Sequence, residues 1–436
     1  MMKKTVNIIG GGFAGCEAAY QLIKRGIKVN LYDMKPRKFS PAHHSENLCE
    51  LVCSNSFRSD QLENGVGILK EEMRHLDSLI MKMAEKNKVP AGSALAVDRD
   101  LFASDVTNYL KNHPLVNYIS EEVTTILDGP TIIASGPLTS DALSTSISDF
   151  IEKDYLHFFD AAAPIVTKDS IDMNYAYFKS RYDKGDSDYL NCPMNKEEYD
   201  IFYRELINAK CVEFKDFELK YFEGCMPFEE MANRGYKTLL YGPLKPVGLG
   251  RDKDDKPYAV VQLRQDNVIG SLFNIVGFQT HLTWGEQKRI LSLIPALRNC
   301  EIVRYGVMHR NTYMASSECI NNNYQSLKRP DLFFAGQLTG VEGYIESCAS
   351  GLLAALNMYL YLEGKDLLNL DNNTMIGAMA RYVSSCDSKH FQPMNANFGI
   401  VNMDFTIKKD LRKRDFVDRS LTNIDEMVKY IDGTVN

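Results

Sequence analysis

The first 33 residues constrain this chain most, because they place a glycine-rich turn between two predicted strands. Residues 6–9 form a short apolar run, and residues 10–15 read Gly-Gly-Gly-Phe-Ala-Gly. An amphipathic stretch to Gly26 follows, and residues 28–33 form a second run that ends in an acid, Asp33. This order of strand, G-x-G-x-x-G turn, helix, strand and acid is typical of a βαβ unit that binds a dinucleotide.

Each part of the turn has a physical role in such a unit. Gly10 permits the tight turn, Gly12 lets the backbone approach a pyrophosphate, and Gly15 lets the helix pack against the strand. The helix N-terminus offers free N–H groups and a partial positive charge to the phosphates. Asp33 can accept hydrogen bonds from a ribose 2′-OH, which favours FAD or NAD(H) over a 2′-phosphorylated nucleotide. The alternative is a glycine-rich structural turn. The residues that we predict to contact the cofactor here are Gly10, Gly11, Gly12, Phe13, Ala14, Gly15 and Asp33.

A second strand–glycine–helix pattern occurs late in the chain. Residues 331–337 form an apolar run that ends in Gly336 and Gln337, and residues 339–343 lead into a predicted helix that runs to about Leu362. A second helix N-terminus directed at the same cofactor is the natural interpretation. We therefore predict that the cofactor is also contacted by Gly336, Gln337, Gly340 and Tyr344.

The middle of the chain has a different composition. Between residues 183 and 313 Tyr, Phe, Cys, Pro and charged residues mix with short helical and strand signals. We predict an α/β fold with a Rossmann-like, FAD-binding domain of the two-dinucleotide-binding flavoprotein type. This domain is discontinuous, over 1–182 and 314–436, and a mixed α+β insertion domain occupies 183–313.

Composition excludes several classes of protein. The 436 residues are 44% hydrophobic and 25% charged, and they contain no run of about 18 apolar residues, so we expect no membrane span. The N-terminus enters a strand at once without a signal-peptide pattern, and we expect a cytoplasmic location. A net charge of −7 argues against indiscriminate nucleic-acid binding, although a local basic patch remains compatible with it, such as residues 408–414.

The ten cysteines predict neither a disulfide framework nor a metal site. They are spread thinly, no C-x-x-C pair occurs, and none has metal-ligand spacing with histidine. Most are expected to be small buried hydrophobic residues.

Several longer strings match one family. They include LVCSNS at 51–56, VPAG at 89–92, AVDR at 96–99, FEGCMP at 222–227, GPLKPVGL at 242–249, WGEQ at 284–287, RYGVMHRNT at 304–312 and FQPMN at 391–395. From residue 4 to about 400, the chain resembles the folate- and FAD-dependent RNA (uracil-5-)-methyltransferases, the TrmFO family. Three positions depart from the family's usual residues: Asp33 replaces Glu, Phe57 replaces Leu and Cys348 replaces Ala. We expect these departures to leave flavin binding intact, and they could affect which RNA is bound.

The resemblance implies covalent catalysis by a cysteine. C5 of uracil is a poor nucleophile, and a thiolate that adds to C6 converts C5 into an enolate carbon that attacks an electrophile. The resemblance implies that Cys225 is this nucleophile and that Cys53 removes the C5 proton or assists the flavin step; the division of roles between the two stays open. From the residues alone, either thiol could instead be a core residue, although turn-like neighbours flank both.

The resemblance also implies the co-substrates. Methylenetetrahydrofolate donates the carbon, reduced FAD carries it and supplies reducing equivalents, and NADPH or NADH regenerates the flavin. His309, Arg310 and Lys245 are the candidates for contact with folate or RNA, and Tyr344 is the candidate for an aromatic platform at the flavin. Each of these residues also has a plain structural interpretation, in the core or on a solvated face.

The RNA target remains open between relatives. A tRNA T-loop uridine is the default, large-subunit (23S) ribosomal RNA is the alternative, and the insertion domain is expected to face the RNA. An FAD/NAD(P)H oxidoreductase without an RNA substrate is an alternative of another class. We expect a monomer or a homodimer that needs neither a metal nor a membrane.

Overall fold

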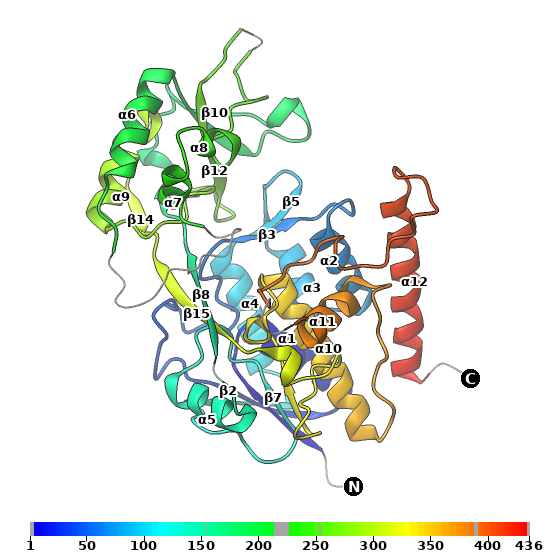
Figure 1. The fold of residues 1–436 in the computed structure, drawn as a ribbon. Coiled ribbons are helices and arrows are strands. Elements are labelled where there is room, and N and C mark those ends of the chain that lie inside the picture. The colour runs from blue at the N-terminus through cyan, green and yellow to red at the C-terminus, as the bar shows by residue number, and fades with distance from the viewer. Residues whose placement is uncertain (1–3, 154, 213–225, 253, 388–390, 434–436) are drawn as a thin grey trace.

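A five-stranded parallel sheet forms the centre of the larger of two units. The structure is a computed structural model that describes residues 4–153, 155–212, 226–252, 254–387 and 391–433. The strands lie in the order β16 (Leu332–Phe334), β7 (Thr131–Ile133), β1 (Thr5–Ile9), β2 (Lys28–Asp33) and β6 (Val116–Ser120), and every neighbouring pair is parallel. The carboxyl ends of all five strands therefore meet at one edge, which confirms the predicted Rossmann-like α/β fold (Figure 1).

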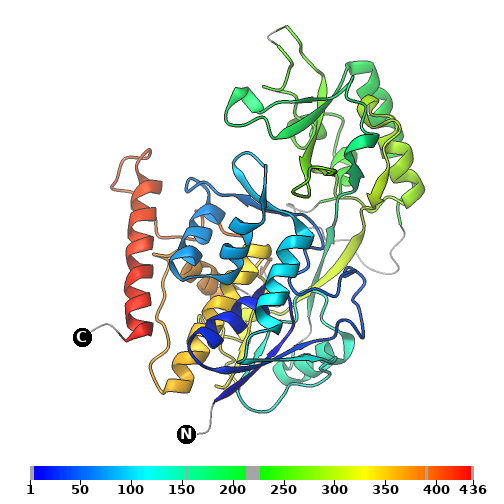
Figure 2. The same ribbon diagram turned by 180° about the vertical axis from the view of Figure 1, so that it is seen from behind.

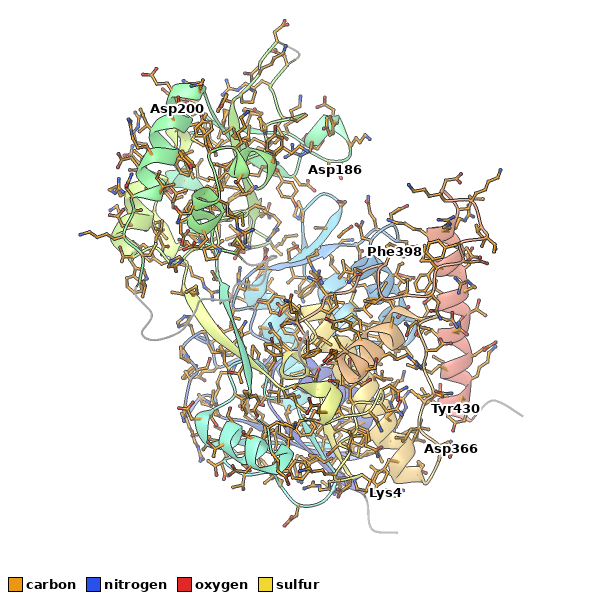
Figure 3. The ribbon with its side chains drawn as sticks, in the orientation of Figure 1. Lys4, Asp186, Asp200, Asp366, Phe398 and Tyr430 are labelled. Carbon is orange, nitrogen blue, oxygen red and sulfur yellow. The ribbon has the colours of Figure 1, made fainter. Side chains whose placement is uncertain are left out.

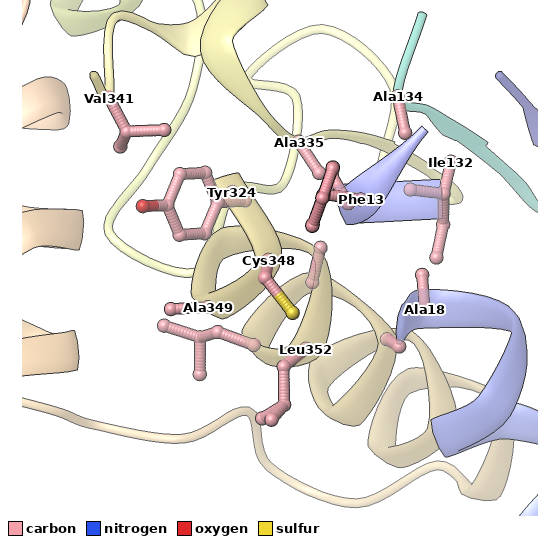
Figure 4. Close-up of a cluster of buried hydrophobic side chains, with 14 of the residues drawn as sticks. Phe13, Ala18, Ile132, Ala134, Tyr324, Ala335, Val341, Cys348, Ala349 and Leu352 are labelled. Carbon is pink, nitrogen blue, oxygen red and sulfur yellow. The ribbon is translucent and has the colours of Figure 1, made fainter. Parts of the chain in front are cut away.

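Two helices pack closely on this sheet and on each other. They are α1 (Phe13–Lys24) and α10 (Tyr344–Glu363), and their shared core contains Phe13, Ala18 and Cys348 beside Ile132 of β7 (Figure 4). A Cβ atom on Gly351 of α10 would lie 2.1 Å from the carbonyl oxygen of Ala14, so this crossing requires glycine. By length and composition α10 could cross a membrane, but 83% of its apolar window is buried in the protein, as in the core helix of a globular domain.

Two buried carboxylates join helices that are distant in the sequence. Glu17 of α1 accepts hydrogen bonds from the Ser78 hydroxyl at 2.7 Å and the Ile80 N–H at 3.0 Å, at the start of α3 (Leu79–Lys86). Glu72 of α2 (Gly65–His75) accepts from the first N–H groups of α11 (Met375–Ser385), and the hydroxyl of Ser420 in α12 (Arg412–Asp432) donates to it. Burial raises the pKa of both carboxyls, that of Glu72 to about 7.

The end of α12 is held against the loop that follows α10. The Tyr430 hydroxyl donates a hydrogen bond of 3.0 Å to the Asp366 carbonyl, and the two residues lie side by side in Figure 3. The remaining elements of the larger unit surround the same core. They are α4 (Arg99–Lys111), α5 (Asp141–Ile151) and a three-stranded sheet of β3 (Ser56–Ser59), β5 (Ala94–Val97) and β4 (Lys88–Val89).

A second, antiparallel sheet forms the smaller unit, which lies at the top of Figures 1 and 2. Its order is β10 (Tyr177–Phe178), β11 (Tyr189–Met194), β12 (Ala259–Gln265), β13 (Leu272–Ile275), β9 (Ile165–Thr167) and β14 (Ile302–Arg304). Its separate core also includes side chains of α6 (Lys196–Ile207), α7 (Phe228–Asn233), α8 (Thr238–Tyr241) and α9 (Trp284–Leu291).

The core of the smaller unit begins earlier in the chain than residue 183. Strands β9 and β10 pair within its sheet, and its buried residues run from Ala163 to Cys300. Two long strands, β8 (Leu156–Ala161) and β15 (Met308–Tyr313), pair with each other and connect the units. We therefore propose boundaries near 162 and 306 in place of 183 and 313, because a strand belongs to the sheet that satisfies its hydrogen bonds.

Candidate active site

A cavity lies at the carboxyl edge of the parallel sheet, between the N-termini of α1 and α10. Such an edge is where open α/β sheets bind their ligands. The cavity is lined by the turns that follow the five parallel strands β1, β2, β6, β7 and β16. The lining includes Gly10, Gly11, Gly12, Phe13, Ala14, Asp33, Lys35, Ser135, Gly336, Gln337 and Tyr344.

The first turn fits the phosphates of a dinucleotide. Gly10 has φ +114°, and a Cβ atom there would lie 2.3 Å from the Ala134 carbonyl oxygen. A Cβ atom on Gly12 would have no neighbour within 4 Å, so the backbone that precedes α1 faces open space. That combination leaves room for a pyrophosphate at a helix N-terminus, which is the arrangement that FAD requires.

Asp33 is fixed at the rim of the same turn. Its carboxylate accepts the N–H of Gly11 at 3.0 Å and the N–H of Lys35 at 2.8 Å. The acid therefore lies where a ribose hydroxyl is expected.

Two of the predicted cofactor glycines lie behind the lining. A Cβ atom on Gly15 would lie 1.9 Å from the Gly10 carbonyl oxygen, and one on Gly340 would lie 2.3 Å from the Phe391 ring. These two glycines therefore allow the turns to pack closely against the rest of the protein.

Tyr344 connects the cavity to Cys53. Its hydroxyl accepts the Cys53 N–H at 2.9 Å, and its ring stacks on Phe13 at a centroid distance of 4.7 Å. Phe57, one of the departures from the family, packs edge-on against Phe13 at 5.8 Å. The Cys53 sulfur is half-buried and lies 3.9 Å from the carbonyl oxygen of Ala161, at the end of the connecting strand β8. Cys53 thus lies where the cavity meets the junction of the two units.

Three arginines hold the loop that carries Cys53, and we call Arg99, Arg264 and Arg304 the arginine cluster. Arg264 donates to the Ser54 hydroxyl at 2.8 Å and to the Asn55 side-chain oxygen at 3.0 Å. Arg304 donates to the Val52 carbonyl at 2.6 Å, and Arg99 donates to the Leu51 carbonyl.

The arginine cluster concentrates positive charge at this loop. Burial lowers the pKa of Arg264 and of Arg304. Burial also opposes the charge of Arg99, but its ion pair with Asp266, at 2.8 Å, outweighs this and raises the pKa. Guanidinium groups keep their charge in proteins, and nearby positive charge favours the thiolate form of a cysteine.

Sequence reasoning assigned no role to the arginine cluster. Arg99 and Arg304 lie within strings that carry the family resemblance, whereas Arg264 lies in none of them. The one local signal at Arg264 is a cation that follows the mostly apolar stretch 259–263 of β12, where its side chain is buried.

The described structure does not place the other predicted site residues at the cavity. Cys225 lies outside the described residues. His309 and Arg310 form part of β15, but their side chains lie outside the description. Lys245 is exposed on the smaller unit, where its carbonyl accepts a hydrogen bond of 3.1 Å from Arg181.

Among the described residues, one group of side chains has ligand atoms close enough to hold a metal ion: Cys211, Glu229 and His281, within 4.8 Å of one another. His281 Nδ1 lies 2.7 Å from the Glu229 carboxylate, which also accepts from Thr280. Although burial lowers the pKa of His281, its bonds to Cys211 and Glu229 raise it to about 10. A protonated imidazole pairs with a carboxylate rather than a metal, so we interpret this group as a charged anchor.

Comparison with known proteins agrees with this geometry. Residues 5–366 match the family model described as glucose inhibited division protein A. GidA of Aquifex aeolicus has the same fold, with a TM-score of 0.73 at 15% identity, over 99% of this chain and 74% of that one.

The sequence relatives cover nearly the whole chain. The methylenetetrahydrofolate--tRNA-(uracil-5-)-methyltransferase TrmFO of Bacillus subtilis is 57% identical over 99% of this chain and 100% of its own length. The protein of the same name from Exiguobacterium sibiricum is 61% identical over 91% of this chain and 92% of its own. The family resemblance is thereby confirmed, and the chain belongs to the TrmFO family of GidA-type proteins.

Proposed function

We propose that this protein transfers a one-carbon unit from methylenetetrahydrofolate to C5 of a uridine in tRNA, giving 5-methyluridine, with FAD as cofactor and NAD(P)H as reductant. One observation carries the proposal: Val52 and Tyr344 line the dinucleotide cavity, the Tyr344 hydroxyl accepts the Cys53 N–H, and the loop that carries Cys53 is held by the arginine cluster. The relatives named as tRNA methyltransferases support tRNA as the target.

The protein's own groups supply binding and proton transfer. The turns after β1 and β16 would hold the cofactor, and Asp33 would accept hydrogen bonds from its ribose. FAD, when bound, supplies the carrier of the one-carbon unit and the reducing equivalents. The Cys225 thiolate adds to C6 of the uracil, so that C5 becomes nucleophilic. Cys53 removes the C5 proton, and the bond between C6 and Cys225 then breaks, which releases the thiolate and restores the uracil ring.

The experiment compares cysteine variants as purified holoproteins. We expect Cys225→Ala and Cys53→Ala to keep a full complement of FAD and to lose transfer of labelled methylene carbon to unmodified tRNA. Cys386→Ala is the matched control, because Cys386 is half-buried at the end of α11, a different part of the molecule. Undiminished transfer by Cys225→Ala would overturn the assignment of the nucleophile.

The same proteins discriminate against the oxidoreductase alternative. That reading expects rapid NAD(P)H oxidation with a quinone or oxygen, equally fast in the wild type and in both cysteine variants, and no label in RNA. Label in 23S ribosomal RNA instead of tRNA would support the proposed methyl transfer but would show that its target is ribosomal RNA.

A further inference from the structure

We propose that Trp284 and Tyr305 form a stacking subsite for an unpaired nucleobase of the RNA substrate, next to the uridine that reacts. This inference rests on the proposed function and adds a binding site to it. Its basis is an exposed aromatic pair at the junction of the two units, which neither the cofactor cavity nor the protein core accounts for.

The pair has the form of a stacking platform. Trp284, the only tryptophan of the chain, is the first residue of α9, and 63% of its side chain is exposed. Its ring lies nearly parallel to that of Tyr305, with centroids 5.1 Å apart and planes inclined by 18°. Tyr305 thus supports the indole from one side and fixes its orientation. A large aromatic surface held in this way is suited to stacking against a planar base.

Two chain segments place the platform close to Cys53. Tyr305 directly follows Arg304, whose guanidinium donates to the Val52 carbonyl at 2.6 Å. Four residues before Trp284, the Thr280 N–H donates to the Ala162 carbonyl at 3.3 Å, and Ala162 is adjacent to Ala161, which lies against the Cys53 sulfur. Both aromatic residues therefore belong to the wall of the smaller unit that contacts the Cys53 loop.

The charges beside the platform suit a nucleic acid backbone. Lys288 and Arg298 are exposed and line a hollow together with Gly285, the residue after Trp284. Arg289 and Glu301 line the same hollow, and Arg289 pairs with Glu286 at 2.7 Å and Glu205 at 2.6 Å. Lys288 and Arg298 can thus contact phosphates while a base stacks on Trp284, as in proteins that bind splayed, unpaired nucleotides.

The single tryptophan allows a direct optical test. Unmodified tRNA is titrated into the FAD-bound protein while the fluorescence of Trp284 is recorded, and we expect saturable quenching as a base stacks on the indole. Methylenetetrahydrofolate alone serves as the second probe, because its pterin ring is also planar. Quenching by the folate and not by tRNA would assign the platform to the folate and overturn the proposal.

Kinetics provide the second test. Base stacking contributes a factor of about 10 or more to RNA binding, so we expect Trp284→Ala to raise the KM for tRNA about 10-fold. FAD content and NADPH oxidation should stay unchanged, and Trp284→Phe should restore most of the loss. Phe405→Ala is the control, because Phe405 is 75% exposed and lies near the start of α12, in the other unit.

The outcomes separate this inference from the proposed function. If the wild type methylates tRNA but Trp284→Ala leaves the KM unchanged and tRNA causes no quenching, the subsite is rejected and the function stands. If the wild type neither binds nor methylates RNA, both are rejected.

Discussion

One hydroxyl group, that of Tyr344, links the cofactor cavity to a proposed catalytic thiol. The ring lines the cavity and stacks on Phe13, while the oxygen accepts the backbone N–H of Cys53 at 2.9 Å. The two contacts are on different parts of the side chain, so a substitution can remove one and keep the other.

We therefore expect Tyr344→Phe to separate cofactor binding from catalysis. The ring remains, so bound FAD per protein should equal that of the wild type. Loss of the hydrogen bond costs about 1 kcal/mol, and the rate of label transfer to tRNA should fall about fivefold. Tyr430→Phe is the control, since its hydroxyl bonds the Asp366 carbonyl on another surface. A normal rate in Tyr344→Phe would show that this bond does not position Cys53.

At this scale, features built from consecutive residues could be predicted from the sequence, whereas clusters of residues that are distant in the chain could not. The residues around Gly10 and Gly336 are consecutive in the chain, so their turns could be predicted and the cavity contains them. The arginine cluster comes from α4, β12 and β14, and no spacing in the sequence brings residues 99, 264 and 304 together. The stacking of Trp284 on Tyr305 was unpredictable for the same reason.

At the scale of elements, the close crossing of α1 and α10 holds in place the two helix N-termini that line the cavity. The sequence predicted α1 from its amphipathic pattern after a glycine-rich turn, and α10 from a second strand–glycine–helix pattern. It did not predict the crossing, because the requirement for glycine at 351 depends on the Ala14 carbonyl, more than 300 residues away.

We expect Gly351→Ala to destabilise this crossing. Its Cβ atom would lie 2.1 Å from the Ala14 carbonyl oxygen, and overpacking of this kind costs about 1–3 kcal/mol. Thermal unfolding should begin at a lower temperature, and FAD should be retained less well on gel filtration. Gly285→Ala is the matched control, because a Cβ atom on this helical glycine would have no neighbour within 4 Å. Equal stability of the two variants would contradict the account of the crossing.

Glu72 gives the stability of the helical layer a pH dependence. Burial raises its pKa from 4.5 to about 7 in the folded protein. The stabilisation is therefore fully present below pH 4.5 and is lost as the pH rises through 7, by about 3 kcal/mol in all.

Glu72→Gln should remove this dependence. We expect the urea midpoint of the wild type to fall between pH 5 and 8 more steeply than that of Glu72→Gln. Glu71→Gln, at a partly exposed neighbouring position, should keep the slope of the wild type. Parallel slopes for wild type and Glu72→Gln would contradict the raised pKa.

At the scale of the whole molecule, the proposed chemistry depends on the junction of the two units. The larger unit supplies the cofactor cavity and Cys53, and the smaller one supplies Arg264, Arg304 and the aromatic platform. The connecting strands β8 and β15 run between the two units beside this junction (Figure 1). The sequence indicated an inserted unit from its change in composition, but the sheet that β9 and β10 join could be assigned only from the structure.

The most direct test of the account follows the methylene carbon. The holoprotein is incubated with labelled methylenetetrahydrofolate, NADPH and total RNA from cells that lack 5-methyluridine, and the RNA is then separated by size and digested to nucleosides. The account predicts label in the tRNA fraction, recovered as 5-methyluridine. Label in large ribosomal RNA alone would contradict the tRNA target, and NADPH oxidation without label in any RNA would contradict the account as a whole.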